Sequence, residues 1–402
     1  MPFEVPEGWV WTTLGEISTY GECNTITIDE IGKDDWILEL EDLEKDTAAI
    51  IQTLTKKERS IKGVRHKFCK GEVLYSKLRT YLNKVLVAPN DGYCTTEIMP
   101  FNSFCSISTD YLCHVLRSSY FLGYTLQCGY GVKMPRLSTN DARKGMIPLP
   151  PLAEQLRIVN EIERSFAAIN TLENSKTHLQ TAIKQAKNKI LDLAIHGKLV
   201  PQDPNDEPAS ELLKRINPKV EITCDNGHYP IGWIKTILGE LFSHNTGKAL
   251  NSSNKEGIFK DYLTTSNVYW NKFDFTVIKQ MPFKESELDK CTVTKGDLLV
   301  CECGDIGRSA IWNFDYDICI QNHIHRLRPK IDLCVPFYYY TFAYLKENNL
   351  IGGKGIGLLG LSSNALHKIE LPLPPLAEQQ RIVQKIEALF SVLDNIQNAL
   401  EV

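Results

Sequence analysis

The sequence has no apolar run long enough to cross a membrane and no amino-terminal signal. Among its 402 residues 43% are hydrophobic and 23% are charged, yet no unbroken apolar stretch reaches the roughly 18 residues that a spanning helix needs. The first residues also lack the basic, apolar and small-residue regions of a secretion signal. These absences predict a soluble protein of the cytoplasm without a membrane partner.

Twelve cysteines are present, but none forms a Cys-x-x-Cys pair. Because they are scattered along a long chain without a secretion signal, we expect reduced thiols and no disulfide framework. Cys301 and Cys303 are too close together for a usual zinc knuckle, and a site built on His323 and His325 has no evident third ligand. We therefore expect neither a bound metal nor another cofactor.

Sequence signatures of an enzyme are missing as well. The chain contains no Gly-x-x-x-x-Gly-Lys-Ser/Thr loop, no Asn/Asp-Pro-Pro-Tyr/Phe motif of amino-methyltransferases and no convincing pair of nucleophile and base. Its net charge of −4 gives no general attraction to nucleic acid, so any DNA-binding surface must be a local patch. The sequence thus predicts a protein without catalytic activity of its own.

The sequence does contain an internal duplication. Pro6–Trp9 recurs as Pro230–Trp233, and the stretch Leu-Pro-Pro-Leu-Ala-Glu-Gln that ends at Gln155 recurs up to Gln379, both displaced by 224 positions. Smaller anchors between these motifs keep a displacement of 224 or 225, among them Lys70-Gly71-Glu72 against Lys295-Gly296-Asp297 and Gly129, Gly131, Leu137 and Ser138 against Gly353, Gly355, Leu361 and Ser362. Each half is therefore predicted to be one structural unit. Outside the anchors the halves have diverged, as expected for two modules that attach alike but recognise different targets.

Within each half, short apolar runs broken by Gly, Asn and Asp predict strands over residues 9–125 and 233–345. The aromatic-rich stretches 110–126 and 335–345 have helical spacing and predict helices packed on those strands.

A proline pair, Pro150-Pro151, then introduces a long helix from Leu152 to His196, about 67 Å at ~1.5 Å per residue. Its three-four apolar spacing predicts a coiled-coil seam, and the same pattern begins after the second domain. The two helices are expected to pack antiparallel, unevenly because Val402 aligns with His178. The predicted packing residues are Leu152, Leu156, Val159, Ile162, Phe166, Ile169, Ile382, Ile386, Leu389 and Phe390.

The predicted fold class is α+β: two similar mixed α/β domains joined by two long antiparallel coiled-coil helices in a pseudo-twofold internal duplication. The predicted boundaries are 1–150 for the first domain, 151–198 for the first helix, 199–228 for a proline-rich linker, 229–374 for the second domain and 375–402 for the short second helix.

The repeated Leu-Pro-Leu-Pro-Pro-Leu-Ala-Glu-Gln-x-Arg-Ile-Val motif, the repeated Pro-x-Gly-Trp opening and the segment from Ile195 to Ser210 resemble the type I restriction-modification specificity subunit family. The resemblance covers nearly the whole chain, with the motifs in the family's order and present twice. It implies that the two domains are target-recognition domains for double-stranded DNA and that the helices are spacers. It also implies adenine methyltransferase (M) subunits and a translocating restriction (R) subunit as partners. Whether the isolated chain forms a homodimer is left open.

Candidate DNA contacts in the first half lie in and after the densest basic stretch, Lys56 to Lys84, with ten Lys or Arg against two Glu. Lys77, Arg79, Tyr81 and Lys84 follow a predicted strand end, where loops can reach phosphates and base edges. The alternative is a solvated charged face. An acidic stretch from Asp29 to Asp46 would leave this domain polarised.

In the second half, the turn that follows Cys301 presents Arg308, and Asn322 and His323 stand near a strand start. Arg is the commonest reader of guanine but also a common surface ion-pair residue, and the other two side chains equally suit core hydrogen bonds. The paired glycine loops 129–136 and 352–357 add Lys133, Arg136 and Lys354, and their glycines would allow close approach to a phosphate. A packing turn is the alternative there.

Two other function classes fit part of the sequence. A coiled-coil adaptor that joins two proteins without reading DNA agrees with the modest net charge. A fragment of a fused nuclease-methyltransferase would explain the resemblance without a catalytic motif. The recognised bases do not follow from the sequence, because base choice depends on loop geometry.

Overall fold

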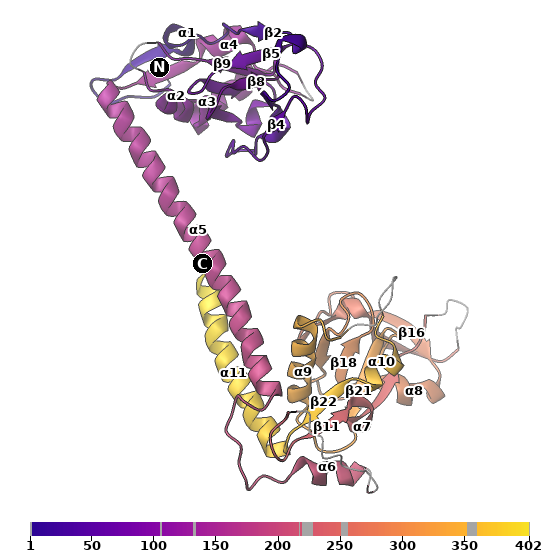
Figure 1. Ribbon diagram of the computed structural model, residues 1–402. Helices are drawn as coiled ribbons and strands as arrows, with labels where there is room; N and C mark the ends of the chain where they lie inside the picture. Colours follow the sequence, from indigo (N-terminus) through magenta and orange to yellow (C-terminus); the bar gives the residue numbers. More distant parts are fainter. Residues whose placement is uncertain are drawn as a thin grey trace. The chain divides into compact units, whose positions relative to one another are not determined.

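The computed structural model describes residues 2–104, 107–131, 134–216, 218, 228–250, 256–351 and 360–401. The chain divides into two compact units, Met1–Glu173 and Asn174–Val402 (Figure 1). The division falls inside the long helix α5 (Leu152–Ile195), so each unit includes part of that helix. Across the described ranges, no helix is both long enough and apolar enough to span a bilayer.

Within its described residues, the first unit holds three small sheets and four short α-helices before α5. The strands are β1 (Val10–Thr13), β2 (Thr25–Ile26), β3 (Trp36–Leu38), β4 (Leu54–Thr55), β5 (Arg65–Phe68), β6 (Val73–Ser76), β7 (Val85–Val87), β8 (Gly92–Cys94), β9 (Ile98–Phe101) and β10 (Met146–Leu149), and the helices are α1 (Leu14–Ile17), α2 (Thr109–Arg117), α3 (Ser119–Cys128) and α4 (Thr139–Lys144). The sheet orders are β2-β5-β8-β3-β4, β7-β6-β9 and β1-β10.

The second unit repeats this plan. Its strands are β11 (Ile234–Ile237), β12 (Phe242–Thr246), β13 (Ile258–Leu263), β14 (Val268–Tyr269), β15 (Lys272–Phe273), β16 (Lys279–Phe283), β17 (Thr292–Val293), β18 (Leu298–Cys301), β19 (Ser309–Ile311), β20 (Ile318–Ile320), β21 (Ile324–Pro329) and β22 (Glu370–Leu373), and its helices are α6 (Ala209–Ile216), α7 (Leu238–Leu241), α8 (Glu285–Cys291), α9 (Val335–Glu347), α10 (Ser363–His367) and α11 (Leu376–Ala399). The orders are β16-β13-β20-β17, β12-β21-β18-β19, β14-β15 and β11-β22.

The two units share the central part of their topology, and they differ in edge strands and in the pair β14-β15 of the second unit. Each contains a parallel strand pair, β3 with β8 and β13 with β20, and a central antiparallel strand, β6 or β18, flanked on both sides. The strand that opens each unit pairs with the strand that closes it in the same register, Val10 opposite Leu149 and Ile234 opposite Leu373. The predicted α+β duplication is therefore confirmed at the level of strand register.

The repeated Pro-Pro-Leu-Ala-Glu-Gln motif has a structural reason. The Gln155 side chain is buried, accepts a hydrogen bond from the Ser108 backbone N–H at 2.9 Å and donates one to the Pro150 carbonyl at 2.9 Å. Gln379 is also buried and makes the corresponding bonds to Cys334 N–H (3.0 Å) and to the Pro374 carbonyl (2.9 Å). Each carboxamide thus links the start of the exit helix to the start of the helix (α2 or α9) that covers the sheet.

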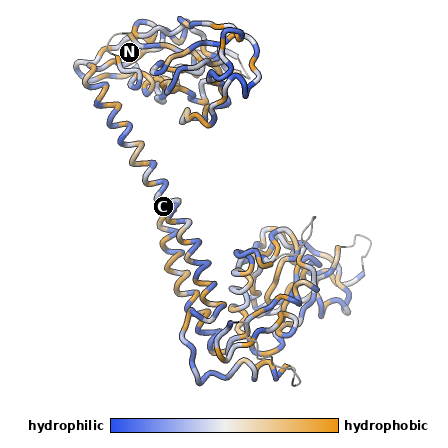
Figure 2. The backbone as a smooth tube through the Cα atoms, in the orientation of Figure 1, coloured by the Kyte–Doolittle hydropathy of each residue, from blue (hydrophilic) through white to orange (hydrophobic). Residues whose placement is uncertain are grey.

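The carboxyl-terminal part of α5 packs antiparallel to α11 within the second unit (Figure 1). Lys187 forms an ion pair with Asp394 at 2.5 Å and lies over the Phe390 ring, whereas Leu191 and Ala194, further along α5, belong to the same core as Ile382 and Ile386 near the start of α11. The hydropathy of α5 alternates along its length (Figure 2).

The predicted seam is buried over only part of its length. Val159, Ile183, Ile382 and Ile386 are buried, whereas Leu152, Leu156, Phe166 and Ile169 are between 41% and 55% exposed. Ile162, Leu389 and Phe390 are intermediate. The contacts of α5 with α9 and α11 run from Lys184 onward, and Val159 is buried within the first unit. Heptad spacing therefore predicted the apolar face but not which part of it this chain covers.

Part of the predicted linker 199–228 is helical. Residues 209–216 form α6, whose Ala209, Leu212 and Leu213 are buried in the second unit. The region thus contributes to the hydrophobic core.

Replacing Gln379 with Leu should destabilise the second unit by about 2 to 4 kcal/mol, because the similar volume leaves the Cys334 N–H and the Pro374 carbonyl buried without partners. Urea unfolding followed by tryptophan fluorescence measures the change. The neighbouring exposed residue supplies the control, since Gln380→Leu should leave the midpoint nearly unchanged. Equal midpoints for both variants would refute the role assigned to the carboxamide.

Candidate nucleic-acid interface

Three of the predicted contact residues of the first unit meet at the end of β6. The Lys77 N–H donates to the Glu97 carbonyl at 3.0 Å, Leu137 N–H donates to the Lys77 carbonyl at 2.9 Å, and Arg79 N–H donates to the Pro135 carbonyl at 2.7 Å. These bonds bring Lys77, Arg79 and the loop that ends at Arg136 together. We call Lys77, Arg79, Glu97 and Arg136 the first edge cluster.

The charges of this cluster are only partly paired. The Arg136 guanidinium forms an ion pair with the Glu97 carboxylate at 2.6 Å, yet its side chain keeps 42% of its surface exposed. Arg79 has a left-handed backbone, with φ of 53°, which is unfavourable for a residue with a Cβ. Strained backbone of this kind is typical of functional loops.

The second unit builds the same edge at the end of β18. The Glu302 N–H donates to the His323 carbonyl at 2.9 Å, and Leu361 N–H donates to the Glu302 carbonyl at 2.9 Å. Glu302 therefore takes the place of Lys77, and His323 takes the place of Glu97. The His323 Nδ1 lies 3.1 Å from the Glu302 carboxylate. This second edge cluster, Glu302 and His323, has an acid where the first unit has a cation.

Arg308 and Asn322, predicted as base contacts, are engaged within the second unit. The Arg308 guanidinium donates to the Thr265 carbonyl at 2.5 Å and lies 5.0 Å from the centre of the Tyr269 ring. The Asn322 backbone N–H donates to the Lys248 carbonyl at 3.0 Å, and its side-chain amide lies 3.5 Å from His323. In this conformation the Arg308 side chain links the turn after β18 to Thr265 and Tyr269.

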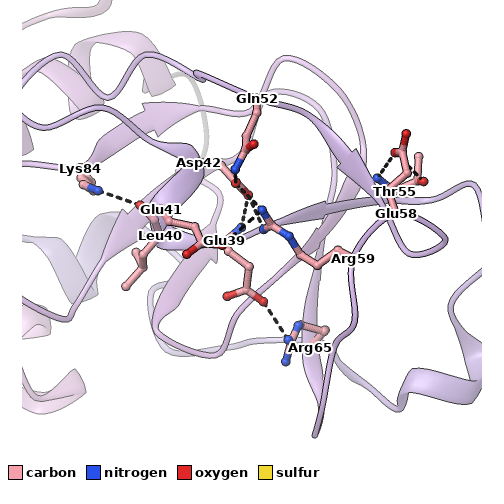
Figure 3. A network of polar contacts seen from close by, with 10 residues as sticks. All are labelled: Glu39, Leu40, Glu41, Asp42, Gln52, Thr55, Glu58, Arg59, Arg65 and Lys84. Atoms are coloured by element: carbon pink, nitrogen blue, oxygen red, sulfur yellow. Dashed lines mark hydrogen bonds and ion pairs between the residues drawn. The ribbon is translucent and has the colours of Figure 1, made fainter. Parts of the chain in front are cut away.

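Part of the basic stretch of the first unit makes internal contacts, among them those of Arg59, Arg65 and Lys84 (Figure 3). Asp42 is fully buried and accepts two hydrogen bonds from the Arg59 guanidinium, at 2.5 and 2.6 Å. Arg65 forms an ion pair with Glu39 at 2.8 Å. The acidic and basic stretches therefore neutralise each other at Arg59 and Arg65, whereas Lys57, Lys62, Lys67 and Lys70 are exposed.

The same network changes the interpretation of Lys84. Its ammonium donates to the Leu40 carbonyl at 2.7 Å, and burial lowers the pKa of the amine (Figure 3). The Lys84 ammonium is thus engaged in an internal hydrogen bond, whereas the Tyr81 side chain is 42% exposed and accessible. Lys133 and Lys354 lie outside the described residues.

A cluster of three histidines, His244, His325 and His367, lies behind the second edge cluster, and no sequence pattern predicted it. His244 Nε2 lies 2.8 Å from His325 Nδ1, and His325 Nε2 lies 2.7 Å from the Leu361 carbonyl, next to the backbone bond that holds Glu302. The His367 ring packs edge-on against His244 at 4.8 Å between centroids. The alternation of side chains along β12 and β21 could have placed His244 and His325 on one face, but pairing these two strands requires the structure.

Burial keeps His244 and His325 uncharged near neutral pH. Burial, and then the neighbouring histidines and Arg326, lower the pKa of His244 from 6.5 to about 4, and burial lowers that of His325. Glu302 opposes the effect at His325. Within the described part of the chain, no group of three or more His, Cys, Asp or Glu side chains is arranged to hold a metal ion.

The comparisons with known proteins agree on one family. Residues 230–402 match the model of the type I restriction modification DNA specificity domain. The chain is 24% identical to the type I restriction enzyme EcoEI specificity subunit of Escherichia coli, over all of this chain and 80% of that protein. It is 29% identical to the EcoDI specificity subunit of the same species over 178 residues, which are 42% of this chain and 39% of the relative.

Two solved structures share the fold. The HsdS subunit from Thermoanaerobacter tengcongensis has a TM-score of 0.62 at 19% identity, covering 100% of this chain and 92% of that one. A chain from a structure concerned with complex assembly and conformational transition of the type I R-M system has a TM-score of 0.64 at 20% identity, covering 100% and 96%.

Acid should destabilise the second unit through His244. Its pKa in the folded state lies below the ordinary 6.5, so the unfolded chain takes up the proton first and stability falls as the pH drops from 6.5 towards 4. Allowing for partial solvent exposure, His244→Gln should remove about 1 to 2 kcal/mol of this loss. Urea titrations at several pH values measure it, with exposed His178→Gln on α5 as the control. Identical pH profiles for wild type and His244→Gln would contradict the assignment.

Proposed function

Because this chain belongs to the type I restriction-modification specificity subunit family, we propose that it reads an asymmetric DNA target made of two half-sites. Each unit would contact one half-site through the edge clusters and neighbouring loops. The chain would contribute recognition and assembly, and chemistry would be carried out by partner subunits. We also propose that it acts in the cytoplasm, where its DNA lies.

The observation that carries this proposal is one backbone frame presenting two different sets of side chains. The same two backbone hydrogen bonds hold Lys77 in the first unit and Glu302 in the second. A lysine or arginine favours guanine and phosphate, whereas a carboxylate accepts a hydrogen bond from the amino group of cytosine. Two edges with opposite charge therefore favour two different half-sites.

We propose that the pair formed by α5 and α11 separates the two readers, so that both face one side of a duplex whose major groove repeats about every 34 Å. Two adenine methyltransferase subunits and a restriction subunit would join this scaffold. The exposed apolar residues of α5, among them Phe166, Ile169 and Leu172, favour a protein partner on the helix.

The test is to express the chain with its methyltransferase and to map modified adenines across a genome. We expect one split, non-palindromic motif. The double variant Lys77→Ala, Arg136→Ala should relax only one half of that motif, and Glu302→Gln only the other, by about 1 to 3 kcal/mol of discrimination per lost base contact.

Control variants come from the duplication itself. Lys144→Ala and Lys368→Ala remove matched, exposed charges in the two units and should leave the motif unchanged. A palindromic motif, or one in which either edge variant relaxes both halves, would contradict the proposal. Weak DNA binding without sequence enrichment would favour a protein-joining adaptor instead.

A further inference from the structure

In the second unit, a segment that follows α5 lies on the repeated motifs. We call residues 197–213 the docking segment, and Pro230, Trp233, Glu378 and Arg381 the motif surface. The backbone of Gly197, with φ of +65°, approaches so closely that a Cβ there would lie 2.3 Å from Pro230 and 3.1 Å from the Trp233 ring. Only glycine fits this contact.

Polar contacts fix the rest of the docking segment. Glu378 is buried and accepts hydrogen bonds from the Trp233 indole N–H at 2.8 Å and from the Gln202 amide at 2.6 Å. Asp206 accepts two hydrogen bonds from the Arg381 guanidinium, at 2.6 and 3.1 Å. The motif surface therefore recognises an amide donor and a carboxylate four residues apart.

The docking segment ends in α6. The Ala209 N–H donates to the Gly232 carbonyl at 2.9 Å, inside the Pro-x-Gly-Trp turn. Leu212 and Leu213 are 1% and 4% exposed. Apolar burial thus adds to the polar recognition.

The first unit carries the same surface on the same backbone. Its residues are Pro6, Trp9, Glu154 and Arg157, displaced by 224 positions from those of the second unit. The Trp9 backbone N–H donates to the Pro6 carbonyl at 3.1 Å, and the Trp233 backbone N–H donates to the Pro230 carbonyl at 3.2 Å. The glycines inside the two turns have φ of +88° and +91°. The two surfaces are therefore superposable by residue and by turn geometry.

The two surfaces differ in how far each one is buried. Trp233 is 2% exposed and its indole N–H is bonded, whereas Trp9 is half-buried and its Nε1 has no hydrogen-bond partner within the described residues. Glu378 is 1% exposed, whereas Glu154 is only half-buried, and Arg157 is exposed. In the second unit the acceptor of the indole N–H is Glu378, which the docking segment also contacts through Gln202. A segment that engages Glu154 in the same way would bring this carboxylate to the Trp9 indole and recover the free energy that an unpaired N–H costs.

We propose that the surface of Pro6, Trp9, Glu154 and Arg157 binds, in trans, a polypeptide segment with the chemistry of residues 197–213. The ligand places a glycine over Pro6 and Trp9, an amide donor on Glu154 and a carboxylate on Arg157. Another protein chain bearing such a segment would thereby attach to the first unit. This inference goes beyond DNA recognition and does not depend on it.

The probe is a fluorescein-labelled synthetic peptide of residues 196–216, titrated with the full chain in the absence of DNA and followed by fluorescence anisotropy. The surface is small, so we expect saturable binding with Kd on the order of 0.1 mM. The peptide should not displace the chain's own docking segment, because that contact is intramolecular and has an effective concentration in the millimolar range or above.

Charge exchange locates the site. Arg157→Asp should weaken binding about tenfold, as should a peptide carrying Asp206→Lys, and the two changes together should restore it. Arg164→Asp, on an exposed position of the same helix, is the matched control and should bind like wild type. Circular dichroism checks that each variant is folded.

Two outcomes would overturn the proposal. One is no saturable binding at peptide concentrations well above the expected Kd. The other is binding that Arg157→Asp leaves unchanged, or that the charge exchange fails to restore. Either outcome leaves the methylation motif of the complex unaffected, so it is distinguishable from a failure of the proposed function.

Discussion

One buried carboxamide in each unit fixes how that unit joins its exit helix. Gln155 and Gln379 each link the backbone at the start of a helix that covers the sheet to the proline that precedes a long exit helix. A buried amide that satisfies both a donor and an acceptor is costly to replace, since either orphaned group would lose its water as well as its partner. This constraint explains why the frame of the two halves stays alike while the lobes diverge.

On this shared backbone arrangement, the side chains of the two edge clusters can differ. The backbone bonds at the ends of β6 and β18 depend on main-chain atoms, so they accept Lys77 or Glu302 equally well. A fixed backbone with variable side chains is what a pair of readers for two different half-sites requires. By contrast, the motif surface and its counterpart in the first unit carry the same four residue types, and what differs is the docking segment that covers the second.

The duplication, the fold class and the long helix were predictable because they depend on local patterns: a repeat at constant displacement, apolar periodicity and proline punctuation. The meeting of Lys77, Arg79 and Arg136 was foreseen only as separate candidates, since a loop about 60 residues downstream of β6 had to return to it. The engagement of Arg59 by Asp42 and of Arg308 by Thr265 was not foreseen, because each pairs side chains and carbonyls that only tertiary packing brings together. Helix α6 was missed because prolines and acids dominate the linker, and its helical face is stabilised by burial against the second lobe.

The most direct measurement replaces residues 10–149 with a second copy of residues 234–373, a junction that keeps the register of the β1-β10 pair and leaves Gln155 in place. The methylation motif of the resulting complex is then mapped. Two identical readers, held apart as proposed, predict a palindromic motif built from the second half-site. An unchanged asymmetric motif in a folded, assembled hybrid would contradict the account that each unit reads its own half-site.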